Sequence, residues 1–419
     1  MGFRFLHLAD CHLETSFGGR PETRERLRRA TREAFKRALD YAIEERLHAV
    51  LIAGDLYDDR LLSNRTELWL VREIRRLAEA GVWLLAACGN HDPGGPEWRA
   101  AQLGLEAGPE AWRSRVRWFR NPTPEAVTVT DPEGLPLGVV VGAGHASERE
   151  SENLAARFGP AEGSLPVVGL LHTQVEAAPG ADRHERYAPS SHLDYRRLDY
   201  SYFALGHIHQ RQRVTGDLPV YYAGNLQGRH SRETGEKGAL VVEAHARAPA
   251  EPRFVRFGPL RWAHLRVGNL PAEGSLSALT DHLAGRIAAE RHGDFEELAI
   301  RLELAGATPH ARVLRSPEER GALEDDLAAA CGAVEVQLRD AGVRLPCDRG
   351  TLREVPTVLA EALVLIERLH SEDALLLELE PTPLARDPRD DAARLRYLRE
   401  LLDDLPEELV ERCLPGASP

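Results

Sequence analysis

In the first 250 residues, short apolar runs alternate with long charged stretches in which apolar residues recur every three or four positions. The short runs predict strands, and the 3.6-residue period predicts helices between them. Strands joined by helices in this way indicate an α/β fold. A helix is expected over Thr23–Arg46, and the eight expected strands are Phe3–Ala9, Ala49–Ala53, Val82–Ala87, Leu137–Gly142, Pro166–Leu171, Tyr202–Leu205, Val220–Tyr222 and Ala239–Glu243.

The alternation starts again at Arg261 and ends at Pro346. It predicts strands and helices in turn over 262–267, 276–290, 298–304, 318–330 and 334–339. Two helical segments, 351–370 and 391–405, follow. We therefore expect a first domain over residues 1–258, a smaller α/β domain over 259–346 and a helical C-terminal segment over 347–419.

The composition limits which classes of protein the chain can belong to. A chain of 419 residues with 43% hydrophobic residues can bury more than one core. No apolar run approaches the roughly 20 residues that cross a bilayer, and the five cysteines lack a Cys-x-x-Cys spacing. We expect a cytoplasmic protein with no membrane segment.

The net charge of −13 is unevenly distributed. Residues 1–250 hold 32 Lys and Arg against 34 Asp and Glu, whereas residues 251–419 hold 21 against 32. Because nucleic-acid binding depends on local positive charge, the acidity of the C-terminal part does not exclude a nucleic-acid partner for the first part.

Five short polar motifs stand where apolar runs stop. In an open α/β sheet, ligands bind beyond the carboxyl ends of the strands, so residues distant in sequence converge there. The sequence predicts one site built from Asp10-Cys11-His12, Gly54-Asp55, Gly89-Asn90-His91-Asp92, His172-Thr173 and Gly206-His207-Ile208-His209.

The residue types of these motifs favour a pair of divalent metal ions. Imidazole and carboxylate ligands without sulfur suit hydrolytic metals such as Mn and Zn. Alternate residues of an extended segment point to the same side, so Asp10 and His12 can share a metal. Asp55 is the candidate for a carboxylate that bridges two cations roughly 3.5–4 Å apart. Asp58 and Asp59 are expected to be helix-capping or solvated carboxylates.

In this order the motifs Asp-x-His, Gly-Asp-x-x-Asp, Gly-Asn-His-Asp, His and Gly-His-x-His resemble the calcineurin-like metallophosphoesterase superfamily. The stretches 204–212, 222–230 and 233–238 resemble the Mre-eleven nuclease family, in particular its bacterial YhaO-type exonucleases. The resemblance covers residues 3–245. It implies a sandwich of two sheets flanked by helices, with a smaller α/β capping domain and a helical C-terminal tail.

The resemblance also implies roles for the motif residues. One Mn²⁺ would be held by Asp10, His12, Asp55 and His209, and the other by Asp55, Asn90, His172 and His207. Mg²⁺, Fe²⁺ or Zn²⁺ are alternatives. His91 would assist the leaving oxygen, and Asp92 would fix the His91 ring. Some family members carry a histidine where this chain has Asp58, so a phosphate contact from that position is not expected.

The function implied by the resemblance is a Mn-dependent DNA exonuclease of DNA repair that hydrolyses phosphodiester bonds by a two-metal mechanism. Its implied partners are DNA, a coiled-coil ATPase of the SMC type and a second copy of the chain. Two alternatives stay open. One is a phosphomonoesterase or cyclic-nucleotide phosphodiesterase of the same fold, and the other is a non-catalytic scaffold that binds DNA ends.

Other positively charged segments are weaker candidates for DNA contacts. Arg229, His230 and Arg232 lie close in sequence to the family-like residues and are predicted to touch the substrate. A helix face with Arg20, Arg24, Arg28 and Arg32, and the segment 112–118, could follow a DNA backbone. The alternative is a solvated helix face and an edge strand. His145, His184 and His192 are expected to be ordinary packing or surface histidines.

Five leucines form a stripe on the helix expected over 391–405. Such a stripe is too apolar to remain exposed. It docks either on the preceding helix of the same chain, over 351–370, or on the partner ATPase. The leucines are Leu395, Leu398, Leu401, Leu402 and Leu405.

Overall fold

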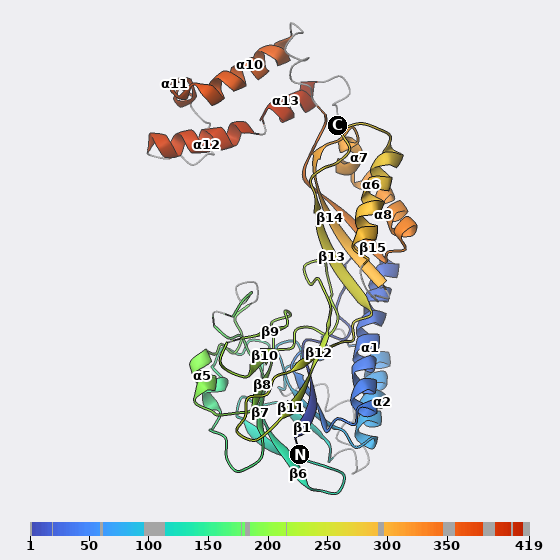
Figure 1. Cartoon of the computed structure of the whole chain (residues 1–419), viewed down its shortest axis with the longest axis vertical. Helices are drawn as coiled ribbons and strands as arrows, with labels where there is room; N and C mark the ends of the chain where they lie inside the picture. Colours follow the sequence, from blue (N-terminus) through green and yellow to red (C-terminus); the bar gives the residue numbers. More distant parts are fainter. Residues whose placement is uncertain are drawn as a thin grey trace. The chain divides into compact units, whose positions relative to one another are not determined.

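The computed structural model describes residues 2–18, 20–58, 62–95, 114–176, 178–180, 185–214, 216–291, 297–346, 357–379, 390–403 and 405–413 (Figure 1). The chain divides into two compact units, Met1–Ala263 with His292–Ala299, and His264–Arg291 with Ile300–Pro419. Among the described helices, none has the length and apolar character needed to cross a membrane.

Two six-stranded sheets form the first unit. The first sheet has the order β12-β11-β1-β2-β3-β4, with β1 to β4 parallel and β11 and β12 antiparallel. Its strands are β1 (Phe3–Leu8), β2 (Ala49–Ala53), β3 (Trp83–Ala87), β4 (Val116–Phe119), β11 (Gly238–Ala244) and β12 (Arg253–Arg256).

The second sheet has the order β5-β6-β7-β8-β10-β9, with a parallel centre and an antiparallel strand at each edge. Its strands are β5 (Glu125–Thr130), β6 (Pro136–Gly142), β7 (Val167–His172), β8 (Tyr202–Gly206), β9 (Gln212–Arg213) and β10 (Val220–Tyr222). The expected α/β fold with two sheets is confirmed.

All eight strands expected in this unit are present, and four further strands were missed. The missed strands β4, β5, β9 and β12 each lie at an edge of a sheet. Edge strands carry charged and half-exposed residues, so they lack the apolar runs by which the central strands are found. For the segment 112–118, the edge-strand alternative is correct over the described residues, while 112 and 113 lie outside them.

The side chains of β1 show how the layers are held together. Phe3 and Phe5 lie in the core between the two sheets, whereas Leu6 and Leu8 lie in the core beneath α1 (Pro21–Glu44) and α2 (Asn64–Glu79). This alternation follows from the two-residue period of a strand. The short α5 (His192–Arg196) and the 3-10 helix η2 (Ala155–Arg157) contribute to a third core with Phe203.

The second unit contains a three-stranded sheet in the order β13-β14-β15. Its leucine- and isoleucine-rich helix α6 packs on α8. The five elements expected over 262–339 are confirmed: β13 (Leu260–Val267), α6 (Leu276–Ala289), β14 (Glu297–Ala307), α8 (Pro317–Cys331) and β15 (Glu335–Arg344). The short helix α7 (Ala311–Arg315) was not predicted.

Four C-terminal helices form a small cluster of their own: α10 (Val358–Ser371), α11 (Asp373–Leu377), α12 (Asp391–Asp403) and α13 (Leu405–Cys413). Leu398 and Leu402 of the predicted stripe are buried against Leu369 and Leu376 of the preceding helices, and Leu395 and Leu405 pack around them. Leu401 stays 52% exposed. The stripe therefore docks mainly on the chain's own helices.

Candidate metal centre

The five motifs follow the carboxyl ends of five strands. Asp10 and His12 come after β1, Asp55 after β2, and Asn90 and His91 after β3. His172 ends β7, and His207 and His209 follow β8. The predicted motifs are thus brought to one place from both sheets.

The loops that carry these residues have unusual backbone angles. Asp10, His12, Asp55 and His207 have φ values of 50°, 45°, 53° and 106°. L-residues adopt such angles at a cost, and they do so mainly at functional sites. Backbone bonds hold two of the loops together, because the His12 N–H donates to the Asp55 carbonyl at 2.9 Å and the Asp10 N–H to the Gly54 carbonyl at 3.2 Å.

Two motif glycines are required by close packing around the site. Gly54 has a φ of 85°, and a Cβ placed there would overlap the ring of His172. A Cβ on Gly89 would overlap the Asp55 carboxylate. The glycines therefore let ligand side chains approach the neighbouring backbone.

The first group of donors comprises Asp10, His12 and His209, whose ligand atoms lie within 4.8 Å of one another. The Nε2 atoms of His12 and His209 are 3.3 Å apart, and His209 Nε2 lies 3.9 Å from Asp10 Oδ1. Asp55 Oδ2 lies 3.7 Å from His12 Nε2. These are the four residues predicted to hold one metal ion.

The second group lies on the other side of Asp55. His172 Nε2 is 3.4 Å from Asp55 Oδ2 and 3.0 Å from Asn90 Oδ1. Asp55 therefore stands between the two groups, as expected of a bridging carboxylate. His207 is further out: its ring centroid is 5.2 Å from that of His172, and its Nε2 lies 2.9 Å from the Glu185 carbonyl oxygen.

The protonation of these groups fits cation ligands. Burial lowers the pKa of His172 to about 4 and that of His209 to about 3, so both rings are neutral, the form that binds metals. Burial, and then the charge of Asp55, raise the pKa of Asp10 well above its usual value. Buried carboxylates facing neutral imidazoles need a compensating charge, and divalent cations between these donors would supply it.

Asp58 has a different role from the one expected. Its Oδ1 accepts hydrogen bonds from His12 Nδ1 at 2.8 Å and from His91 Nδ1 at 3.1 Å, and Thr15 donates to its Oδ2 at 2.6 Å. The expectation of a capping or solvated carboxylate is therefore wrong; Ser63 caps α2. Asp58 orients one predicted ligand and the predicted general acid together.

The expectation that Asp92 fixes the His91 ring is also wrong. The Asp92 carboxylate is buried and accepts the backbone N–H groups of Gly89, Leu56 and Asp55 at 2.7, 2.8 and 3.1 Å. It therefore ties the loop of Asn90 to the loop of Asp55. The Asp92 carboxylate is thus occupied by backbone N–H groups, and it is Asp58 that contacts the half-exposed ring of His91.

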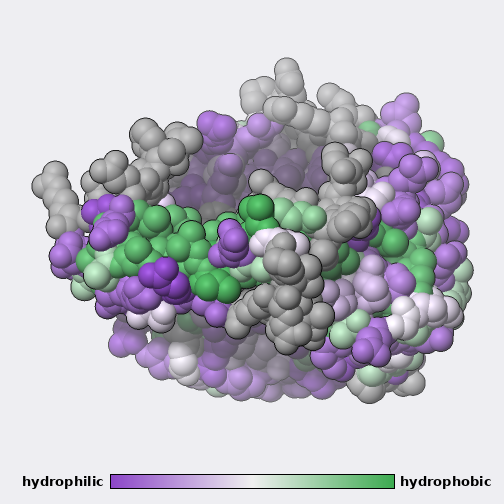
Figure 2. All heavy atoms as spheres, turned by 90° about the horizontal axis from the view of Figure 1, so that it is seen from above, coloured by the Kyte–Doolittle hydropathy of each residue, from purple (hydrophilic) through white to green (hydrophobic). Residues whose placement is uncertain are grey.

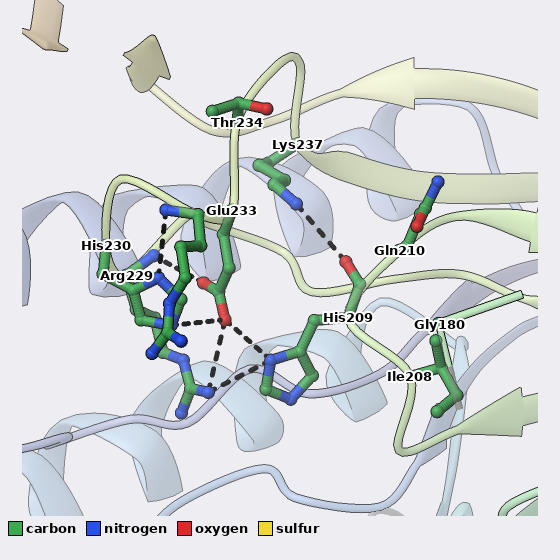
Figure 3. A pocket seen from close by; sticks show the side chains of 10 residues that line it. Gly180, Ile208, His209, Gln210, Arg229, His230, Glu233, Thr234 and Lys237 are labelled. Carbon is green, nitrogen blue, oxygen red and sulfur yellow. Dashed lines mark hydrogen bonds and ion pairs between the residues drawn. The ribbon is translucent and has the colours of Figure 1, made fainter. Parts of the chain in front are cut away.

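Glu233 is a functional residue that the sequence did not identify. Its Oε1 lies 2.7 Å from His209 Nδ1, and its Oε2 accepts from Asn225 Nδ2 and the Arg229 N–H, both at 2.7 Å (Figure 3). Arg229 Nη2 also lies 3.0 Å from His209 Nδ1. The shorter contact assigns the Nδ1 proton to the bond with Glu233, and Nε2 is the ring atom that faces the predicted ligands His12 and Asp10. The only signal was that Glu233 opens the family-like stretch 233–238.

A cavity of about 510 Å³ opens beside His209. Arg229, His230 and Arg232, the predicted substrate residues, all line it, together with Lys237 (Figure 3). Lys237 Nζ donates to the His209 carbonyl at 3.3 Å. The structure thus brings the three predicted substrate residues together next to the ligand His209.

His145 packs on the site, as expected of a structural histidine. It is buried, its ring centroid lies 5.3 Å from that of His172, and its Nε2 donates to the His172 carbonyl at 2.8 Å. His192 begins the surface helix α5. His184 and Asp59 lie outside the described residues.

Residues 3–211 match the family model for calcineurin-like phosphoesterases. The "Uncharacterized metallophosphoesterase YhaO" of Bacillus subtilis is 30% identical over 330 residues, which are 78% of this chain and 76% of that protein. The chain belongs to the calcineurin-like metallophosphoesterases. It is a metal-dependent phosphoesterase with a site for two metal ions.

This metallophosphoesterase is also similar to archaeal proteins named "DNA double-strand break repair protein Mre11". The protein of Aeropyrum pernix is 28% identical over 256 residues, 59% of this chain and 59% of that protein. The protein of Haloferax volcanii is 35% identical over 253 residues, 57% of this chain and 49% of that protein. The chain thus spans only about half to three fifths of their length.

Proposed function

We propose that this metallophosphoesterase is a Mn²⁺-dependent DNA nuclease, an exonuclease that acts in DNA repair. The observation that carries the proposal is the cationic cavity that continues from His209 along Arg229, His230 and Arg232. A phosphomonoester ends at the metal centre, whereas a phosphodiester chain continues past it and needs further positive contacts. The likeness to proteins named for DNA double-strand break repair supports the same substrate.

In this proposal Asp10, His12, Asp55 and His209 would hold one cation, and Asp55, Asn90, His172 and His207 would hold the other. Mixed nitrogen and oxygen donors without sulfur suit Mn²⁺. When bound, two such cations activate a water nucleophile and offset the charge on the phosphoryl oxygens.

His91 is the group placed to protonate the leaving oxygen. Burial alone would lower its pKa, but the hydrogen bond to Asp58 and the charges of Asp55 and Asp58 raise the pKa to about 9. Bound dications would oppose this rise. The ring is held through Nδ1 by Asp58, and its side chain is 45% exposed, so the opposite nitrogen can reach a substrate.

The test is hydrolysis of four substrates by the purified chain with Mn²⁺ or Mg²⁺: linear duplex DNA, circular single-stranded DNA, bis(p-nitrophenyl) phosphate and p-nitrophenyl phosphate. The proposal expects degradation of linear DNA from its ends and cleavage of the diester. Hydrolysis of the monoester alone would assign a phosphomonoesterase instead. DNA binding without any hydrolysis would assign a non-catalytic DNA-end scaffold.

From the family resemblance we further propose a coiled-coil ATPase of the SMC type and a second copy of this chain as partners. The ATPase would contact the apolar side chains that the C-terminal helices leave exposed, which include Val358, Val364 and Leu365 of α10. Figure 2 shows a band of hydrophobic residues on the face seen from above. We expect Leu365→Glu to keep the melting temperature and lose capture of the ATPase. Leu402→Ala should instead lower the melting temperature because Leu402 is buried.

A further inference from the structure

A second cavity, of about 380 Å³, lies between α1 and α2, which contact one another. We call it the α1–α2 groove. Five of its lining residues are cationic, one is acidic (Glu33) and one is aromatic (Trp69). The cationic residues are Arg29, Arg32 and Lys36 of α1 and Arg65 and Arg72 of α2.

The positive charge of the groove is only partly neutralised by the protein. Among the described residues, no carboxylate lies within 4.0 Å of Arg29, Arg65 or Arg72, and all three are exposed. The acidic lining residue Glu33 is already paired with Arg37 at 2.7 Å. Like charges three and four positions apart on a helix repel one another. In a chain of net charge −13, this concentration of cations is complementary to an anionic ligand.

The spacing of the cations suits a repeating anion. Arg29, Arg32 and Lys36 stand at positions i, i+3 and i+7, and Arg65 and Arg72 at i and i+7, so each set lies on one helix face. Seven residues of helix span about 10.5 Å. In duplex DNA the phosphates of one strand repeat at about 3.4 Å of axial rise, and in an extended single strand they lie further apart. The cations of each face are therefore spread over a length that covers at least two successive phosphates.

The groove is joined to the metal centre by hydrogen bonds. Arg32 Nη1 lies 3.3 Å from Glu14 Oε1 and 3.1 Å from Thr66 Oγ1, and Thr66 also donates to Glu14. Glu14 follows the ligand His12 by two residues in the same loop. The groove therefore adjoins the loop that carries the predicted ligand His12.

Trp69 gives the groove a surface for bases. Its ring packs edge-on against Phe35 with ring centroids 6.0 Å apart, and the residue is half-buried. A held aromatic ring in a cationic groove suits stacking with the unpaired bases of a single strand.

We propose that the α1–α2 groove binds the phosphate backbone of a single-stranded segment of the DNA substrate, with Trp69 stacking on a base. The inference rests on the proposed nuclease function and adds a binding site outside the metal centre. It differs from the helix face singled out by the sequence, with which it shares only Arg32.

The test compares Arg29→Gln/Arg65→Gln/Arg72→Gln with a control of equal charge, Arg75→Gln/Arg157→Gln/Arg196→Gln. The control arginines are exposed and each pairs with a carboxylate. Binding of a fluorescein-labelled 20-nucleotide oligothymidine is followed by anisotropy in EDTA, where hydrolysis stops. We expect the groove variant to bind at least tenfold more weakly than the control. The plot of log affinity against log salt should be less steep for the groove variant, by about two. Three arginines are removed, and each single-strand phosphate contact contributes about 0.7 to the slope.

Two further measurements separate the possible outcomes. Trp69→Leu should weaken binding about fivefold without changing the salt slope, because stacking involves no counterions. The groove variant should hydrolyse bis(p-nitrophenyl) phosphate like the wild type. Equal binding by the groove and control variants, or a loss confined to duplex DNA, would overturn the inference while the nuclease proposal stands. If the wild type neither bound nor degraded DNA, both proposals would be wrong.

Discussion

The two sides of the metal centre hold their histidines by different means. On one side, His12 and His209 are anchored through Nδ1 by the carboxylates of Asp58 and Glu233. On the other side, His172 Nδ1 and His207 Nε2 face the backbone carbonyls of Ala53 and Glu185, each at 2.9 Å. We call these the carboxylate side and the carbonyl side.

The difference has an electrostatic consequence. A carboxylate partner fixes the tautomer of a ligating histidine and also makes the ring a stronger donor, whereas a carbonyl mainly fixes its orientation. The carboxylate side should therefore bind its cation more tightly. Only on that side can the substitution of an anchoring side chain change the metal affinity, because the anchors of the carbonyl side are backbone groups.

The largest effect is expected for Asp55→Asn, which removes the negative charge shared by the two sides. Both cations should be lost together, because Asp55 Oδ2 lies within 3.7 Å of ligand nitrogens on each side. Metal analysis after gel filtration in Mn²⁺ should show well below one equivalent, and hydrolysis should fall below detection. Retention of one full equivalent would show that Asp55 serves a single side.

Next come the single-side variants His12→Ala and His172→Ala. Each should remove about one of two equivalents of Mn²⁺, since the two rings approach Asp55 Oδ2 as members of different predicted ligand sets. In a calorimetric titration, His12→Ala should eliminate the tighter binding step and His172→Ala the weaker one. Identical loss of both steps in the two variants would contradict the division into sides.

The variant His91→Ala should keep a metal ion on both sides and slow hydrolysis. The ring is held by Asp58 and is assigned as proton donor, so its removal should lower kcat by about 10²–10⁴. Metal content measured in the same sample is the control. Loss of a full equivalent of Mn²⁺ would make His91 a ligand and the assignment wrong.

The smallest effect is expected for the anchors themselves. Glu233→Gln should weaken Mn²⁺ binding about 10–100-fold on the carboxylate side alone, measured by calorimetry against the exposed matched control Glu236→Gln. Asp58→Asn should weaken the same side and additionally lower kcat, because Asp58 also holds His91. Equal weakening of both sides by Glu233→Gln would remove the distinction between them.

The motifs could be found in the sequence because each ligand stands at the end of an apolar run. The anchors could not be found in this way. Asp58 meets a ring 46 residues away and Glu233 one 24 residues away, through loops whose backbone angles no local pattern encodes. The α1–α2 groove could not be predicted either, because Arg29 and Arg65 line the same cavity only after the two helices have packed. The edge strands were not predicted because their half-exposed residues do not form apolar runs.

The buried Asp92 has a consequence for how the enzyme acquires its ions. Its three bonds to backbone N–H groups clamp the loops of Asp55 and Asn90 by protein contacts alone. The structural zinc sites of small domains differ, because there the metal must be present for the chain to fold. We therefore expect the first unit to keep its fold when EDTA removes the metal ions.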